Sequence, residues 1–174
     1  MALNTEIFRS EGGFGVNSKT IVSSSYDIKN VNSLELKNSN YTNCSRTDYI
    51  LRSVTSAAAP TAVLSLLSSS VTPVSLQTSS VNFVTSQLIG TNSNGSGFYG
   101  IKLENIVTVD ALGDVVAVSF LRTILKDSIP SGEGWTVSTY DNGSANQFSY
   151  VVNQGTATGN ILWTAHMQVV TADW

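Results

Sequence analysis

The segment at residues 161–171 constrains the fold more than any other stretch of the chain. Apolar side chains occupy every second position: Ile161, Trp163, Ala165, Met167 and Val169. The positions between them are mostly polar: Leu162, Thr164, His166, Gln168 and Val170. Because successive side chains of a β-strand point to opposite faces, this alternation predicts a strand with one buried face. It does not follow the i, i+3, i+4 and i+7 stripe of an amphipathic helix.

Other stretches of the chain also predict strands. The extended candidates that lead up to the last one are residues 81–89, 98–108, 115–126, and 135–140 with 148–153, preceded by shorter candidates at 31–37 and 46–54. Residues 92–97, Asn-Ser-Asn-Gly-Ser-Gly, give the strongest turn signal, because Asn and Gly tolerate the positive φ that tight reversals often require. Residues 61–76 fit either a helix or a buried strand. Strand or irregular structure is favoured there, because prolines bound the segment and its serines weaken a helix.

These patterns predict an all-β protein, an antiparallel β-sandwich of jelly-roll or Ig-like type with an extended N-terminal arm. The sandwich is expected over residues 31–174, with residues 81–171 as its clearest part. Its core candidates are Trp135 and Trp163.

Residues 1–30 carry little periodicity and are predicted to form a docking arm. Isolated apolar residues in a polar context are the candidate anchors: Phe8, Phe14, Ile21 and Tyr26. Such an arm can dock on a neighbouring subunit. The alternatives are a disordered terminus or a strand added to the chain's own sheet.

Composition excludes several classes of partner. Charged residues make up 12% of the 174 residues, about half of the usual roughly 25%. The nine Lys and Arg are scattered, and the net charge is −3, so we expect no nucleic-acid partner, which would need clustered cations. No apolar run reaches the length of about 20 residues that spans a bilayer, and the first residues do not resemble a signal peptide. We therefore expect no membrane partner, and synthesis in a cytosol-like compartment.

Candidate chemistry is sparse in the sequence. Cys44 and His166 are the single cysteine and histidine. Cys44 could act as a nucleophile with His166 as its base, but a half-buried structural thiol and a polar surface histidine are favoured. Asp110 and Asp114 flank a turn and are weak evidence for calcium. The sequence thus predicts no catalytic residue, no metal, no cofactor and no enzymatic activity.

The order of segments from residue 81 to 170 carries a family resemblance. Its most specific parts are Gly97-Phe-Tyr-Gly-Ile-Lys-Leu-Glu104, Gly134-Trp135-Thr-Val-Ser138 and residues 160–170, centred on Trp163. This order resembles a β-sandwich domain that recurs in structural proteins of tailed bacteriophages, including fibres, appendages and capsid-decorating proteins. The resemblance covers about half of the chain and supplies no catalytic residues.

The resemblance implies a virion structural protein that is assembled in the host cytoplasm. We expect a capsid decoration (cement) protein or a short head or tail fibre component. Its expected partners are itself, as a homotrimer, and the major capsid protein or other virion proteins. Two alternatives stay open: a carbohydrate- or receptor-binding module of a tail fibre, and a hydrolase that uses His166. The aromatic residues that could stack on a sugar are Tyr99, Tyr140, Tyr150 and Trp174.

Overall fold

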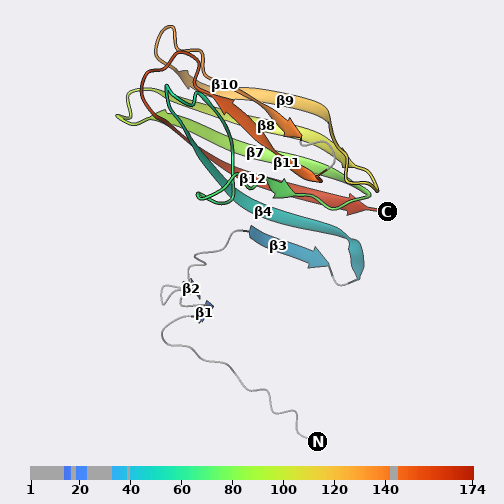
Figure 1. Ribbon diagram of the computed structural model, residues 1–174. Helices are drawn as coiled ribbons and strands as arrows, with labels where there is room; N and C mark the ends of the chain where they lie inside the picture. The colour runs from blue at the N-terminus through green and yellow to red at the C-terminus, as the bar shows by residue number, and fades with distance from the viewer. Residues whose placement is uncertain (1–13, 17–18, 23–32, 39, 142–144) are drawn as a thin grey trace, which may run out of the picture. The chain divides into compact units, whose positions relative to one another are not determined.

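The computed structural model describes residues 14–16, 19–22, 33–38, 40–141 and 145–174 (Figure 1). The chain divides into two compact units, Met1–Asn32 and Ser33–Trp174. In the first unit the described residues form an antiparallel hairpin of β1 (Phe14–Val16) and β2 (Lys19–Val22). Phe14 and Ile21 of the predicted arm lie in these two strands, whereas Phe8 and Tyr26 lie outside the described residues. The docking role of the arm therefore stays a prediction.

The second unit is a sandwich of two antiparallel sheets. The larger sheet has the order β3 (Ser33–Asn38), β4 (Tyr41–Thr55), β12 (Ile161–Asp173), β7 (Ser80–Asn92), β8 (Phe98–Val109) and β9 (Val115–Ser128). The smaller sheet contains β10 (Thr136–Asp141), β11 (Gln147–Asn153) and β5 (Thr61–Val63), and β6 (Val74–Ser75) also pairs with β11. The prediction of an all-β antiparallel fold is confirmed, and the described residues contain no helix. Among the described residues there is accordingly no helix long and apolar enough to cross a membrane.

The last strand of the chain lies in the middle of the larger sheet. β12 pairs with β4 from Ile161↔Thr55 onward and with β7 from Ile161↔Asn92 onward. Because both edges of β12 are paired, one of its faces can be fully buried by the smaller sheet. The apolar face that the sequence predicted is indeed buried: Ile161, Trp163, Ala165, Met167 and Val169 are each at most 3% exposed.

The turn at residues 92–97 joins β7 to β8 as a hairpin. Gly95 has φ of 71°, a left-handed value that a glycine adopts without strain. The Asn92 side chain accepts a hydrogen bond from the backbone amide of Gly97 at 3.0 Å. The polar sequence of this turn thus supplies both the backbone freedom and the bonds that reverse the chain.

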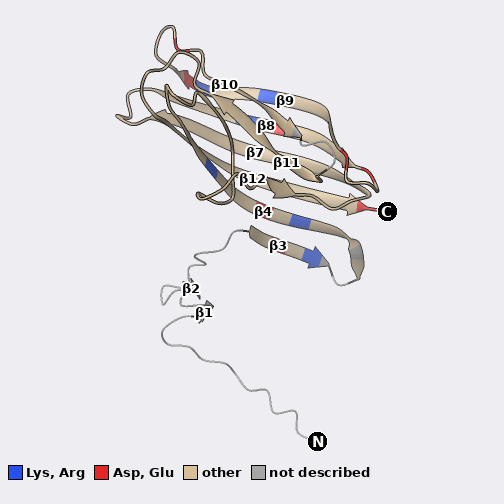
Figure 2. Ribbon diagram, in the orientation of Figure 1, with Lys and Arg blue, Asp and Glu red and all other residues tan. Residues whose placement is uncertain are grey.

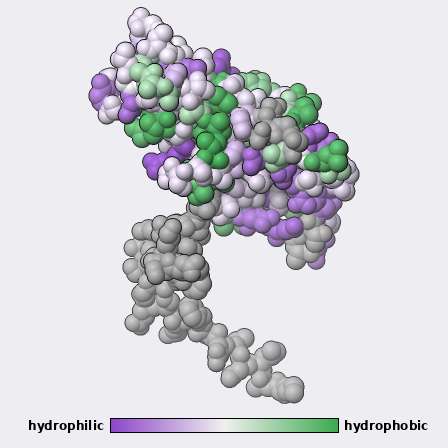
Figure 3. Space-filling view, in the orientation of Figure 1, coloured by the Kyte–Doolittle hydropathy of each residue, from purple (hydrophilic) through white to green (hydrophobic). Residues whose placement is uncertain are grey.

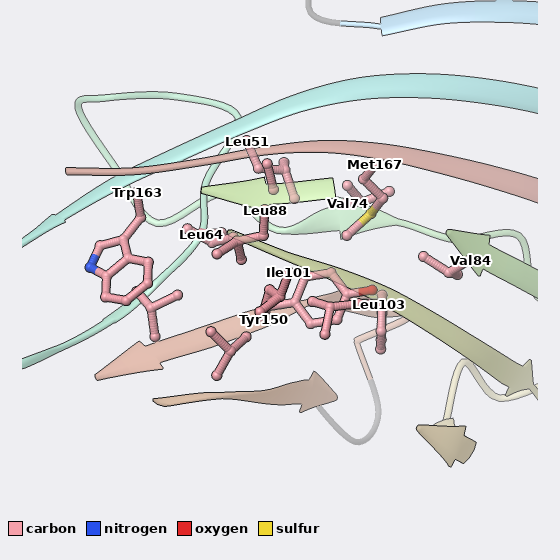
Figure 4. Packing of buried hydrophobic residues seen from close by; sticks show 14 of the residues in the cluster. Leu51, Leu64, Val74, Val84, Leu88, Ile101, Leu103, Tyr150, Trp163 and Met167 are labelled. Carbon is pink, nitrogen blue, oxygen red and sulfur yellow. The ribbon is translucent and has the colours of Figure 1, made fainter. Parts of the chain in front are cut away.

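The core lies between the two sheets (Figure 4). The rings of Trp163 and Trp135 meet edge to face, with centroids 5.7 Å apart. The indole nitrogen of Trp163 donates to Thr55 Oγ1 at 3.0 Å. The ring lies on Gly90, where an added Cβ would approach it to 2.4 Å. Only a glycine therefore fits under Trp163.

A buried polar bridge also ties the sheets together. The hydroxyl of Tyr150, on β11, donates to Asn105 Oδ1 at 2.8 Å and accepts from Ser86 Oγ at 3.1 Å. Asn105 in turn donates to the backbone carbonyl of Ser119 at 3.0 Å. Burial raises the pKa of Tyr150 far above its ordinary value, although the hydrogen bond with Ser86 acts in the opposite direction. The hydroxyl therefore stays neutral and serves as a structural link.

Candidate functional site

One face of the larger sheet points away from the smaller sheet, and we call it the outer face. Every second residue of β4, β12, β7 and β8 lies on this face, as strand alternation and the pairing registers show. Its middle is polar on β12 and β8, with His166 and Gln168 on the first strand and Lys102 and Glu104 on the second. On β4, however, Ile50 lies beside His166 and is 53% exposed. Large apolar side chains lie toward both ends of the strands. Several of them are more than 40% exposed in the chain: Val54, Phe83, Ile89, Phe98, Leu162 and Val170.

The single histidine has an acidic partner on the outer face. His166 Nε2 lies 3.2 Å from Asp48 Oδ1, and Asp48 also accepts hydrogen bonds from Arg46 and Gln168. Burial alone would raise the pKa of Asp48, but the hydrogen bonds from Arg46 and Gln168 and the nearby charges lower it below its ordinary value. Asp48 is more than 100 positions from His166 in the chain. No sequence pattern therefore indicated this pair.

Cys44 and His166 do not form a catalytic pair. Ala172 is the cross-strand partner of Cys44, six residues beyond His166 on β12. At a rise of about 3.3 Å per residue this separates the two by roughly 20 Å. Cys44 is exposed, and its thiol contacts the backbone carbonyl of Tyr41 at 3.5 Å. The expectation of a half-buried thiol was wrong, because the register places Cys44 on the outer face, which the smaller sheet does not cover.

A hollow of about 790 Å³ opens beside β4, where β3 has ended and the chain at residues 65–71 takes its place. Ser65 pairs with Arg52 through two backbone hydrogen bonds of 3.0 and 2.9 Å. Apolar walls come from the outer face, from Ile50, Val54 and Leu162. The hydroxyl-bearing residues Ser68, Ser69 and Ser70 line the other side.

The loop that borders this hollow is held in shape by one buried hydroxyl. Ser65 Oγ donates to the carbonyl of Ser70 at 2.8 Å and accepts from the backbone amides of Leu67 and Thr72 at 3.3 and 2.8 Å. Ser65 is 8% exposed, and these bonds are partly buried. Because its turn is closed by these internal bonds, the loop is preformed.

Arg52 is the cation of the hollow. It is exposed on β4, and none of the ion pairs recorded between described residues involves it. An Arg guanidinium presents a planar set of donors that matches a carboxylate or sulfate. Together with the serine hydroxyls, it can bind a polar, anionic ligand against apolar walls.

Two carboxylates in the loops of the sandwich have structural roles. Asp110 Oδ1 accepts from the amides of Leu112 and Asp114, which closes the turn between β8 and β9. Glu133 accepts from the indole nitrogen of Trp135 at 2.8 Å. Within the described ranges, no group of three or more His, Cys, Asp or Glu is placed to hold a metal ion.

The aromatic residues considered for sugar stacking have different positions. Tyr99 and Tyr150 are 2% and 0% exposed and belong to the core, so their assignment to a binding surface was wrong. Tyr140 is half-buried and Trp174 is 76% exposed. Sequence reasoning missed the hollow instead. Its only signal was the mixed run of Leu and Ser at residues 64–70, which has no helical or strand period.

Lys and Arg are distributed over several strands of the sandwich (Figure 2). Apolar and polar residues are likewise interspersed on the side shown in Figure 3.

Comparisons with known proteins find structural likeness alone. No family model and no curated protein matches the sequence. A tailspike protein of Acinetobacter baumannii bacteriophage Fri1, described as a capsular polysaccharide depolymerase, is similar over 92% of this chain, with a TM-score of 0.47 and 12% identity. The tailspike protein of Acinetobacter baumannii phage AM24 is similar over 74% of this chain, with a TM-score of 0.34 and 9% identity. The chain spans about a quarter of either tailspike, 25% and 26% of their lengths.

These findings correct one prediction from the sequence. The interpretation that the protein is not an enzyme is withdrawn, because the phage Fri1 tailspike is described as a depolymerase. That description applies to the whole tailspike, of which this chain matches 25%.

Proposed function

We propose that this chain is a β-sandwich module of a bacteriophage virion, of tail-fibre type, that binds a carbohydrate receptor in the hollow beside Arg52. The observation that carries the proposal is the hollow itself, with a preformed loop and a cation that has no ion-pair partner among the described residues. Its volume of about 790 Å³ falls in the range of about 300–1,000 Å³ that is usual for small-ligand sites.

The lining of the hollow suits a sugar that carries an acidic group. The hydroxyls of Ser68, Ser69 and Ser70 can donate and accept, as sugar hydroxyls do. The side chains of Val54 and Leu162 offer an apolar wall to the C–H face of a sugar ring. Arg52 would bind a carboxylate or sulfate through two parallel hydrogen bonds. The proposed ligand is therefore an acidic surface saccharide.

Virion origin is supported by the sequence resemblance to phage structural domains. Within that class, the hollow favours receptor binding over capsid decoration, because a cement protein needs a docking surface and no ligand cavity. The proposed location is the virion, with the saccharide on the host surface as the partner.

Calorimetric titration with acidic and neutral oligosaccharides tests the proposal. We expect the wild-type chain to bind an acidic oligosaccharide and Arg52→Gln to weaken that binding at least tenfold. The matched control is Arg122→Gln, which changes an exposed arginine on β9, at the opposite edge of the larger sheet. An unchanged affinity in Arg52→Gln, or no binding of any oligosaccharide at millimolar concentration, would contradict the proposal.

A further inference from the structure

The strand β9 forms one edge of the larger sheet and exposes much apolar surface (Figure 1). Within the described part of the chain it pairs with β8 on one side and with no strand on the other. Six large apolar side chains along it are between 42% and 68% exposed: Val116, Val118, Phe120, Leu121, Ile124 and Leu125. A long apolar edge strand of this kind associates readily with other chains. We therefore expect a partner to cover it.

The apolar residues of β9 lie on both faces of the sheet. Ile124 pairs with Ile101 of β8, which is buried, so Ile124 and Phe120 lie on the inner face, toward the smaller sheet. Leu121 pairs with Glu104 and lies on the outer face. The smaller sheet covers β8 but not this part of β9, because Ile101 is 1% exposed and Ile124 is 49% exposed. A partner that covers one face alone leaves the other apolar residues in water.

Charges of opposite sign lie on the two faces at matching heights along the strand. The register places Lys126 on the outer face and Asp127 on the inner face. It also places Arg122 on the inner face, one position along the strands from Glu104 on the outer face. None of the ion pairs recorded between described residues involves Arg122, Lys126 or Asp127. Glu104 contacts Lys102 through one oxygen at 2.9 Å, and a carboxylate can accept a second donor.

We infer that three copies of this chain associate through β9 about a three-fold axis parallel to the strand, with the inner face of each β9 against the outer face of the next. A two-fold contact joins a patch to itself, so it would leave one apolar face of β9 uncovered. A cyclic contact joins two different patches and covers both. Because equivalent residues lie at the same height around such an axis, Asp127 of each copy meets Lys126 of the next. Arg122 meets Glu104 in the same way.

Packing distances favour three copies. Sheets that pack face to face lie about 10 Å apart, so three β9 strands form a triangle whose corners are roughly 6 Å from the axis. The exposed side chains of β9 fill that space. Four strands at the same spacing would place opposite strands about 14 Å apart and leave the axis open. The number agrees with the homotrimer expected from the sequence.

This association leaves the hollow open. Leu162 on β12 and Val54 on β4, which supply apolar walls, lie on the third and fourth strands from β9. At about 4.8 Å per strand, they are separated from β9 by roughly 14 and 19 Å. Each copy of the trimer therefore keeps its own hollow. Variants of β9, Arg122→Gln included, should leave saccharide binding to each copy unchanged, so the two proposals can fail independently.

Light scattering and sedimentation equilibrium of the full chain test the inference. We expect a mass of three times 18.5 kDa for the wild-type chain. Ile124→Asp places a charge among the apolar residues of each contact and should raise the concentration of half-dissociation at least about tenfold. The matched control is Leu36→Asp, because Leu36 is 53% exposed on β3, at the opposite edge of the same sheet. This control should remain as trimeric as the wild type.

A charge exchange tests which faces meet. Lys126→Glu alone places two carboxylates together at each contact and should weaken association. Adding Asp127→Lys restores an opposite pair with the signs exchanged, and association should return to within about threefold of the wild type. A monomeric or dimeric wild-type chain, an Ile124→Asp chain that stays trimeric at wild-type concentrations, or a double variant as weak as the single one would overturn the inference.

Discussion

The two faces of the larger sheet carry similar apolar side chains in different surroundings. On β7 and β12, Leu88 and Met167 of the inner face are at most 1% exposed, whereas Ile89 and Val170 of the outer face are 58% and 43% exposed. Their polar groups differ as well. Tyr150 reaches Ser86 and Asn105 in a sealed bridge between the sheets, while the ion pairs of the outer face are open to water. The position of the smaller sheet, rather than the hydrophobicity of a residue, decides which face forms the core.

The largest expected difference in the free energy of unfolding lies between variants of two neighbouring residues on β12. Trp163→Ala should lower the free energy of unfolding by about 3–5 kcal/mol, because it leaves a cavity next to Trp135. Leu162→Ala, on the outer face, should cost less than about 1 kcal/mol. Urea unfolding of both variants measures the difference. Equal losses would show that the two faces are equally buried in solution.

A pair of glycines gives an intermediate contrast. Gly90→Ala brings a Cβ to 2.4 Å from the Trp163 ring, and overpacking of this kind costs about 1–3 kcal/mol. Gly100 has nothing within 4 Å of an added Cβ. Gly100→Ala should be neutral or stabilise the strand by up to about 1 kcal/mol. Thermal unfolding of the two variants checks this, and a larger loss in Gly100→Ala than in Gly90→Ala would be the wrong order.

The smallest effect concerns pH and the outer face. Asp48 has a pKa below its ordinary value of 3.8, so its ionised form stabilises the fold fully above that value, and this contribution is lost as pH falls through the lowered pKa. Asp48→Asn should therefore reduce stability by up to about 1 kcal/mol at neutral pH. The difference in stability between the wild type and Asp48→Asn should disappear in stronger acid. Urea unfolding at a series of pH values measures it, and a gap that widens on acidification would contradict the assignment.

The sequence determined most of the longer strands and the buried face of β12. The alternation at residues 161–171 identified the buried side chains of β12, and the predicted segments correspond to β7, β8, β9, β10, β11 and β12 with boundaries shifted by a few residues. This information is local, because a period of two is set by the geometry of each strand. Asn92 and Gly95 likewise encode a turn through their own bonds and φ.

Tertiary structure determined the contacts between distant segments, which the periodicity of a single strand does not encode. The insertion of β12 between β4 and β7, the Asp48 and His166 pair, and the hollow at Arg52 join residues that are far apart in the chain. The roles of Tyr99 and Tyr150 also depended on it, because a tyrosine suits both a core and a sugar surface. Alternation assigns a side chain to one of two faces, and only the packing of distant strands determines which face is covered and which groups meet there.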